Sequence, residues 1–245
     1  MAHDSTLTRL ASVSESQWGL ITRRQAEGAG VSRPTIDRLA ADGSVLERVA
    51  HGVYRLAGAP IPDHLELRAA WLQLAPEVRA WERTAHQGLV SHRSAAALYG
   101  IGHLPADRQE FTLAKRRQTR RADVRLHIRP VADTKWTEVR GLPVTRPSQI
   151  ATDLLRDRED PGAVAQIVAD AIRNAYDDPG TFADALRPFA AQFGLRRRDG
   201  VALLRWLLDL VGDQDTARWM EEARASADRE ATQEPERTTT TGAPR

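Results

Sequence analysis

The residues best suited to chemistry in this chain of 245 residues are arginines that lie within and just after short helix signals near the N-terminus. A guanidinium group binds phosphate oxygens or the edge of a guanine through paired hydrogen bonds, so clustered arginines point to nucleic-acid recognition. The surrounding elements must place these groups on one surface. Thr22 can cap a helix that runs to Ala29, and Gly30 interrupts it. Ser32 can cap a second helix that has Pro34 in its first turn.

A two-stranded ribbon is expected after the second helix, which Gly43 ends. Residues 45–49 alternate loosely between apolar and charged types, Gly52 supplies a turn, and residues 53–56 return as the second strand. Two short capped helices followed by a ribbon are typical of a winged helix-turn-helix domain, whose usual ligand is duplex DNA. The sequence therefore predicts a DNA-binding module over residues 21–56.

The second predicted helix has an apolar side and a polar side. At 100° per residue, Ile36, Leu39 and Ala40 share one side, which we expect to pack on the first helix. A recognition helix presents its N-terminal residues to base edges, while a wing reaches phosphates. The predicted DNA contacts are Arg24, Ser32, Arg33, Thr35, Arg38, Arg48, His51 and Arg55. The alternative is a small helical domain whose arginines are simply solvated.

A second basic cluster lies in the middle of the chain. Between positions 115 and 129, seven basic residues face one acidic residue, Asp123. Residues 110–114 and 124–128 alternate like strands, so the segment between them is predicted to be the loop of a β-hairpin. Such a loop can neutralise phosphates of DNA or RNA, although a solvated loop or an acidic protein partner would need the same charges. The possible phosphate contacts are Lys115, Arg116, Arg117, Arg120 and Arg121.

The fold class predicted for the whole chain is α+β. A winged helix-turn-helix domain over residues 1–60 is followed, over residues 61–212, by a larger, mostly helical domain with a small β-sheet and the basic hairpin. Two very short strands are expected at 136–139 and 142–145, and the apolar residues 201–211 predict a buried central helix. Residues 213–245 are expected to be partly helical and then disordered.

Composition limits the classes of function. The chain has no cysteine, which excludes disulfides, cysteine zinc fingers and iron–sulfur clusters. Signal-peptide and membrane-span patterns are missing, so we expect a cytoplasmic protein without membrane contact. No nucleotide-binding, serine-hydrolase or zinc-protease motif is present, and the seven histidines lack metal-ligand spacing. We therefore expect no cofactor, no metal and no catalytic residue.

One enzymatic alternative stays open. Asp133 and Lys135 have the Asp-x-Lys spacing found in metal-dependent nucleases, where carboxylates hold Mg²⁺ and a lysine polarises the attacking water. The upstream acidic partner would be Asp107, Glu110 or Asp123. Three residues at this spacing arise readily by chance, so we do not favour this function.

Several segments resemble the AbiEi-type antitoxins, which are transcriptional regulators of type IV toxin–antitoxin operons. The strongest similarity lies in "GVSRPTIDRL" and "HGVYRL", and further segments are "LVSHRSAAALYGI" and "VRGLPVTRPSQIATDLL". Together they cover most of residues 14–160. The resemblance implies a regulator that binds inverted repeats at its own promoter and counteracts a nucleotidyltransferase-type toxin, with or without direct contact. A stand-alone winged-helix regulator without a toxin partner is the alternative.

Overall fold

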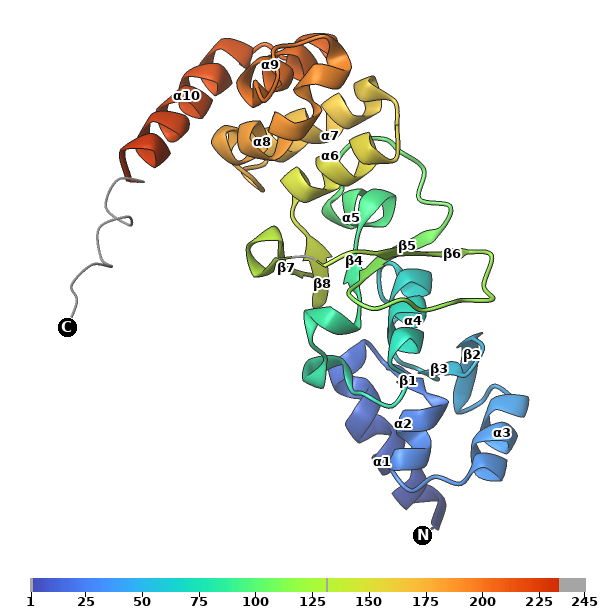
Figure 1. Cartoon of the computed structure of the whole chain (residues 1–245). Coiled ribbons are helices and arrows are strands. Elements are labelled where there is room, and N and C mark those ends of the chain that lie inside the picture. Colours follow the sequence, from blue (N-terminus) through green and yellow to red (C-terminus); the bar gives the residue numbers. More distant parts are fainter. Residues whose placement is uncertain (1, 131, 234–245) are drawn as a thin grey trace, which may run out of the picture. The chain divides into compact units, whose positions relative to one another are not determined.

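A computed structural model describes residues 2–130 and 132–233 (Figure 1). The chain divides into two compact units. The first comprises Met1–Ser94, Ala106–Ala132 and Glu138–Val144, and the second comprises the remaining segments. The boundaries predicted at residues 60 and 212 are those of domains expected to fold independently. The division into two compact units does not test independent folding, so these boundaries remain predictions. Most of the predicted disordered tail, residues 234–245, lies outside the described residues.

The N-terminal part of the first unit is a winged helix-turn-helix, as predicted. Two of its elements were not expected from the sequence: a helix before the predicted module and a strand that leads into it. In chain order, the elements are α1 (Ala2–Ser14), β1 (Leu20–Thr22), α2 (Arg23–Gly28), α3 (Arg33–Ala41), β2 (Leu46–Ala50) and β3 (Val53–Leu56), with a short 3₁₀ turn, η1 (Glu15–Gln17), after α1.

The two predicted helix caps are confirmed. The Thr22 hydroxyl accepts a hydrogen bond from the Gln25 amide at 3.1 Å, and the Gln25 side chain accepts one from the Thr22 amide at 2.9 Å. The Ser32 hydroxyl accepts from the Thr35 amide at 3.4 Å, and Pro34 lies in the first turn of α3. These bonds satisfy backbone donors that a helix leaves without partners at its start.

A three-stranded antiparallel sheet in the order β1-β3-β2 completes the module. Its core is a set of fully buried apolar side chains from the helices and strands, including Leu10 and Val13 of α1. The other members of this core are Ile21, Ala26, Val31, Ile36, Leu39, Leu46 and Tyr54. Because β1 pairs with β3, the second ribbon strand is the central strand of the sheet.

The first unit continues through α4 (Leu65–Leu74), which contacts all three strands of this small sheet. Two short 3₁₀ turns follow, η2 (Ala80–Glu82) and η3 (Ala85–Gln87). A second sheet has five strands in the order β6-β5-β4-β8-β7. Its strands are β4 (Leu89–Val90), β5 (Gln109–Leu113), β6 (Val124–Ile128), β7 (Trp136–Val139) and β8 (Leu142–Thr145). The last two match the predicted ranges.

The predicted basic β-hairpin is wrong. Strands β5 and β6 are parallel, with Gln109 opposite Val124 and Leu113 opposite Ile128. A parallel pair cannot be closed by a tight turn, because the chain must run back along the whole strand before it enters the second one. Residues 114–123 make this return, and we call them the crossover loop.

The second unit is mainly helical. After α5 (His92–Tyr99), which the two units share, and the 3₁₀ turn η4 (Asp133–Lys135), its helices follow one another through short turns. They are α6 (Pro147–Arg156), α7 (Pro161–Arg173), α8 (Pro179–Leu186), η5 (Arg187–Phe193), α9 (Gly200–Leu210) and α10 (Thr216–Gln233). Three of these helices have an aspartate cap: Asp160, Asp178 and Asp199 each accept a backbone amide at 2.9 Å.

One helix prediction in this unit needs correction, and one helical segment changes type along its length. Helix α8 is followed directly by the 3₁₀ segment η5, which contains Pro188. Proline has no amide hydrogen to continue an α-helix. Helix α9 is not buried on nearly every side: Leu203, Leu204, Leu207 and Leu208 are buried, but Leu210 is 48% exposed.

Candidate nucleic-acid interface

Helix α3 presents the face that the sequence predicted. Ile36 and Leu39 are buried in the core of the module, whereas Arg33, Pro34 and Arg38 are exposed. The buried leucine and isoleucine fix the rotation of the helix about its axis, so the two arginines are held outward by packing rather than by chance. Their guanidinium groups project from the half of the helix that enters a major groove in this class of domain.

The one acidic residue on this face is neutralised. Asp37 accepts a hydrogen bond from the Arg23 guanidinium at 2.6 Å, and Arg23 also donates to the Tyr54 hydroxyl at 2.7 Å. Its hydrogen bonds to Tyr54 and Asp37 raise the pKa of Arg23. This contact links α2, α3 and β3, and it removes the negative charge that would otherwise repel a phosphate near Arg33 and Arg38.

Three other predicted contacts differ in how free they are. The hydroxyls of Ser32 and Thr35 lie 2.8 Å apart at the start of α3, and the Ser32 hydroxyl also caps the helix. Thr35 is only partly exposed. Arg24, on α2, has an exposed side chain (71%) and lies 3.6 Å from Glu27. Of these three, Arg24 is the group with the greatest reach toward a ligand.

The wing carries two of its three predicted contacts on the surface. Arg48 is exposed and lies 5.9 Å from the Tyr54 ring centroid, and His51 is exposed at the turn between β2 and β3. Arg55 does not lie on the surface: it is 9% exposed, pairs with Glu47 and donates to the Ala59 carbonyl. Its strand is central rather than at an edge, since Leu20 of β1 lies opposite Arg55. Burial and pairing of Arg55 therefore argue against its predicted contact with phosphate.

The different surroundings of Arg48 and Arg55 give a direct test. We expect Arg55→Met to lower the free energy of unfolding by about 1–2 kcal/mol, less than for a fully buried pair because Glu47 stays partly exposed. The same variant should leave the salt dependence of DNA binding unchanged. Arg48→Ala should do the opposite, reducing the slope of log K against log salt by about 0.9 at little cost in stability. Urea unfolding and binding titrations at several salt concentrations measure both effects.

The crossover loop is anchored to the end of α4. Arg117 donates to the Leu74 carbonyl, and Arg121 donates to the Gln73 side chain and to Asp123. Lys115, Arg116 and Arg120 are exposed. Burial, with the positive charge of Arg117 nearby, lowers the pKa of Arg83 to about 9. The exposed basic side chains of this loop concentrate positive charge, which a bound anion would offset.

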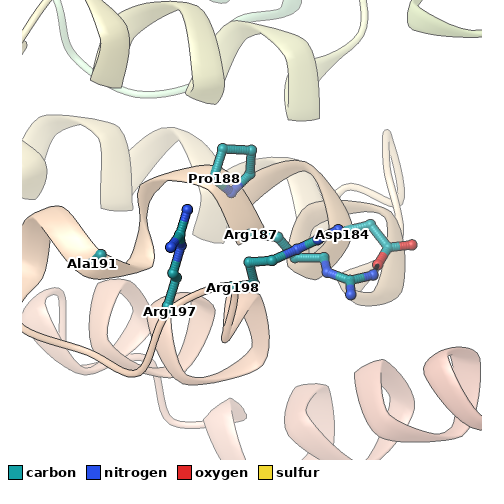
Figure 2. A pocket seen from close by; sticks show the side chains of 6 residues that line it. All are labelled: Asp184, Arg187, Pro188, Ala191, Arg197 and Arg198. Atoms are coloured by element: carbon teal, nitrogen blue, oxygen red, sulfur yellow. Dashed lines mark hydrogen bonds and ion pairs between the residues drawn. The ribbon is translucent and has the colours of Figure 1, made fainter.

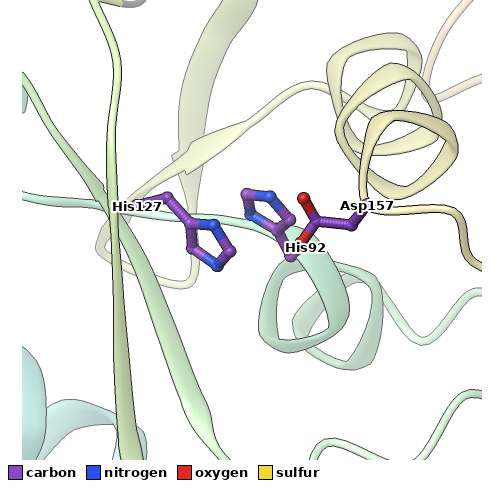
Figure 3. A group of neighbouring side chains, drawn as sticks. All are labelled: His92, His127 and Asp157. Atoms are coloured by element: carbon purple, nitrogen blue, oxygen red, sulfur yellow. The ribbon is translucent and has the colours of Figure 1, made fainter.

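Two histidines that are 35 positions apart meet where strand β6 lies beside the start of α5. The rings of His92 and His127 are stacked, with centroids 3.5 Å apart and planes 12° apart (Figure 3). His127 Nε2 lies 2.7 Å from Glu110 Oε2, and His92 Nδ1 lies 3.0 Å from Ser91 Oγ. The spacing of the two histidines along the sequence does not predict this pair. His127 lies beside His92 because β6 pairs in parallel with β5, and that pairing could not be predicted from the sequence.

The residues of the nuclease alternative have structural surroundings of their own. Glu110 is buried and lies beside His127 and, at 3.8 Å, Arg125. Asp123 is hydrogen-bonded to Arg121, which lowers the pKa of its carboxyl. Asp133 and Lys135 lie on the 3₁₀ turn η4, where the Trp136 indole donates to Asp133 at 3.4 Å. None of these contacts favours nuclease chemistry.

The second unit has a basic hollow that was not predicted from the sequence. A cavity of about 570 Å³ is lined by Arg187, Arg197, Arg198 and Asp184, together with Pro188 and Ala191 (Figure 2). Arg197 and Arg198 extend from the segment before α9, and Arg187 lies 3.5 Å from Asp184. The run of three arginines at 196–198 was the available sequence signal.

The fold and the exposed face of α3 define a winged helix-turn-helix module with basic residues on its surface. Residues 9–57 match the model of the family described as "Transcriptional regulator, AbiEi antitoxin". The resemblance seen in the sequence is therefore confirmed for this segment, which spans the module from α1 to β3. No curated protein matches the chain. Among the described residues, no helix is long and apolar enough to cross a lipid bilayer.

Proposed function

We propose that this protein represses its own operon by binding inverted repeats in the promoter, and that it counteracts a nucleotidyltransferase-type toxin encoded beside it. The winged helix-turn-helix reads the DNA, and occupancy of the operator blocks RNA polymerase. The family match supports the regulator and antitoxin assignment in general terms. The operator, the repression and the toxin are our proposal.

The observation that carries the DNA-binding part is the exposed, positively charged half of α3. Arg33 and Arg38 are exposed there, while Asp37 is neutralised by Arg23 at 2.6 Å. Arginine forms paired hydrogen bonds with guanine in the major groove, and each such contact contributes about 1–3 kcal/mol of base discrimination. Arg48 and His51 of the wing and Arg24 of α2 supply phosphate contacts that fix the helix in register.

The crossover loop adds affinity that does not depend on sequence. Lys115, Arg116 and Arg120 are exposed, and the loop belongs to the same compact unit as the wing. Neutralised phosphates release counterions, so this contribution weakens as salt concentration rises. Specificity then comes from α3, and much of the total affinity comes from the loop and the wing.

We assign antagonism of the toxin to the second unit. Support for this assignment is that the unit has its own apolar core, with Val164, Ile167, Phe182, Leu203 and Leu207 all fully buried. A unit with its own core can supply a surface for a second activity while the winged helix remains on DNA. This assignment does not require direct binding of the toxin. If the protein instead acts on the same cellular target as the toxin, the second unit would supply that surface as well.

A promoter-binding and growth-rescue experiment tests the proposal. The whole protein should bind the DNA upstream of its own gene at least about a thousandfold more tightly than random duplex at physiological salt. Expression of the adjacent gene alone should arrest growth, and co-expression of this protein should restore it. Specific operator binding without any rescue would instead support the stand-alone regulator. Absence of sequence-specific binding would contradict the DNA-binding proposal.

A further inference from the structure

A cavity of about 520 Å³ lies between the wing turn, the start of α2, the end of α4 and the crossover loop. It belongs wholly to the first unit. Its volume falls within the range of pockets that enclose small ligands, roughly 300–1,000 Å³. The residues that line it are Arg23, Arg24, His51, Gly52, Gln73, Pro76, Arg120 and Arg121.

The walls of this cavity are held in place by Gln73. Its side-chain amide donates to the His51 carbonyl at 2.7 Å, and its side-chain oxygen accepts from the Arg121 guanidinium. Arg117 holds the same loop by donating to the backbone of Leu74. One glutamine therefore joins the wing turn to the crossover loop, so two walls of the cavity are held together before any ligand binds.

The charges around the cavity are unbalanced. Four of its eight lining residues are arginines and one is histidine, while no carboxylate is among them. Arg23 and Arg121 already have acidic partners, Asp37 and Asp123. Arg120 has no ion pair within residues 2–130 and 132–233, and Arg24 has only a 3.6 Å contact with Glu27. Two guanidinium groups therefore remain available for an anion.

We propose that this cavity is a phosphate-binding site in which Arg24 and Arg120 are the main ligands. Arginine forks match the oxygens of a phosphate ester, and the surrounding arginines and His51 favour its charge. The ester belongs either to a free nucleotide or to the backbone of the duplex beside the wing. If the phosphate belongs to the duplex backbone, the inference rests on the proposed DNA-binding function. If it belongs to a free nucleotide, the inference is independent of that function. A bound phosphate would tie the crossover loop to the wing.

The test compares two double variants of the full chain that lose the same charge. Arg24→Ser/Arg120→Ser removes the proposed ligands, and Arg79→Ser/Arg108→Ser removes two other exposed arginines of the same unit that do not line the cavity. Calorimetric titration with ATP and with pyrophosphate measures the free-nucleotide source. Titration of a random 20-base-pair duplex at several salt concentrations measures the backbone source. Thermal melting checks that both variants fold.

We expect the cavity variant to bind at least about tenfold more weakly in one of the two assays, because two charge-assisted hydrogen-bonding groups are lost together. The control should change less than about threefold in that assay. Loss confined to ATP or pyrophosphate identifies a nucleotide site, and loss confined to duplex identifies a backbone site. Equal weakening of the two variants, or a wild-type protein that binds neither ligand, would overturn the proposal. The two proposals can also fail separately. If the wild-type protein binds nucleotide but not DNA, and the cavity variant loses nucleotide binding, the site is supported and the proposed DNA-binding function is rejected.

Discussion

The double variant Arg33→Ala/Arg38→Ala is expected to bind the operator roughly 30-fold more weakly or worse, while its circular-dichroism spectrum and melting temperature stay unchanged. The estimate takes the lower end, about 1 kcal/mol, for each lost base contact. Both side chains are exposed on α3, and neither contributes to the core of the module. Loss of binding would therefore come from the interface and not from unfolding.

Binding to random duplex separates reading of sequence from attraction of charge. In the same variant it should fall less than operator binding, because random duplex offers no matched base edges for the two arginines to lose. The salt slope of random-duplex binding should decrease by at most about 1.8. Arg79→Ala/Arg108→Ala, with the same loss of charge, should retain the preference for the operator. If operator affinity is unchanged in the α3 variant, α3 is not the recognition helix.

The second large effect is expected at Gly200, the first residue of α9. A Cβ atom placed there would lie 1.8 Å from the Ala183 carbonyl oxygen and 2.8 Å from its carbon. These are backbone atoms of α8, so the overlap cannot be relieved by rotating a side chain. We expect Gly200→Ala to lower the free energy of unfolding of the second unit by about 3 kcal/mol, at the upper end of the cost of overpacking. The melting temperature should fall by roughly 6–12 °C.

Gly194→Ala is the matched control in the same unit. Gly194 has φ of +73°, but a Cβ atom there meets nothing within 4 Å. This substitution therefore carries only the cost of the left-handed conformation, about 1–2 kcal/mol. Equal melting temperatures for the two variants would show that α8 and α9 do not approach as closely as described.

Gly200→Ala also separates the two proposed activities. Near its melting temperature, the variant should lose rescue from the toxin, because the buried face of α9 belongs to the second unit. Operator binding should persist, since the winged helix-turn-helix has a separate core. Rescue that survives unfolding of the second unit would assign antitoxin function to the DNA-binding module.

The sequence by itself determined the local elements of the module and the face of α3. Thr22 and Ser32 act as caps because their hydroxyls satisfy amides of their own helices, an interaction within three residues. The apolar spacing of Ile36 and Leu39 likewise places the exposed side of α3 without knowledge of any distant contact. Strands β7 and β8 were predicted because Gly141 marks the turn between them.

Tertiary structure decided what depends on pairing between distant strands. Alternation marks 124–128 as a strand but is the same for a parallel and an antiparallel neighbour, so the direction of β6 could not be predicted. Arg55 was predicted to be exposed because the second strand of a two-stranded wing is an edge strand. In the structure, β1 (Leu20–Thr22) pairs with β3, so this strand is not at an edge. The stacking of His92 on His127 and the link from Gln73 to His51 and Arg121 arise in the same way. Local sequence determines hydrogen bonds between residues that are near neighbours in the chain. The contacts just described join segments that are distant in the sequence, so they depend on the tertiary arrangement of strands, helices and loops.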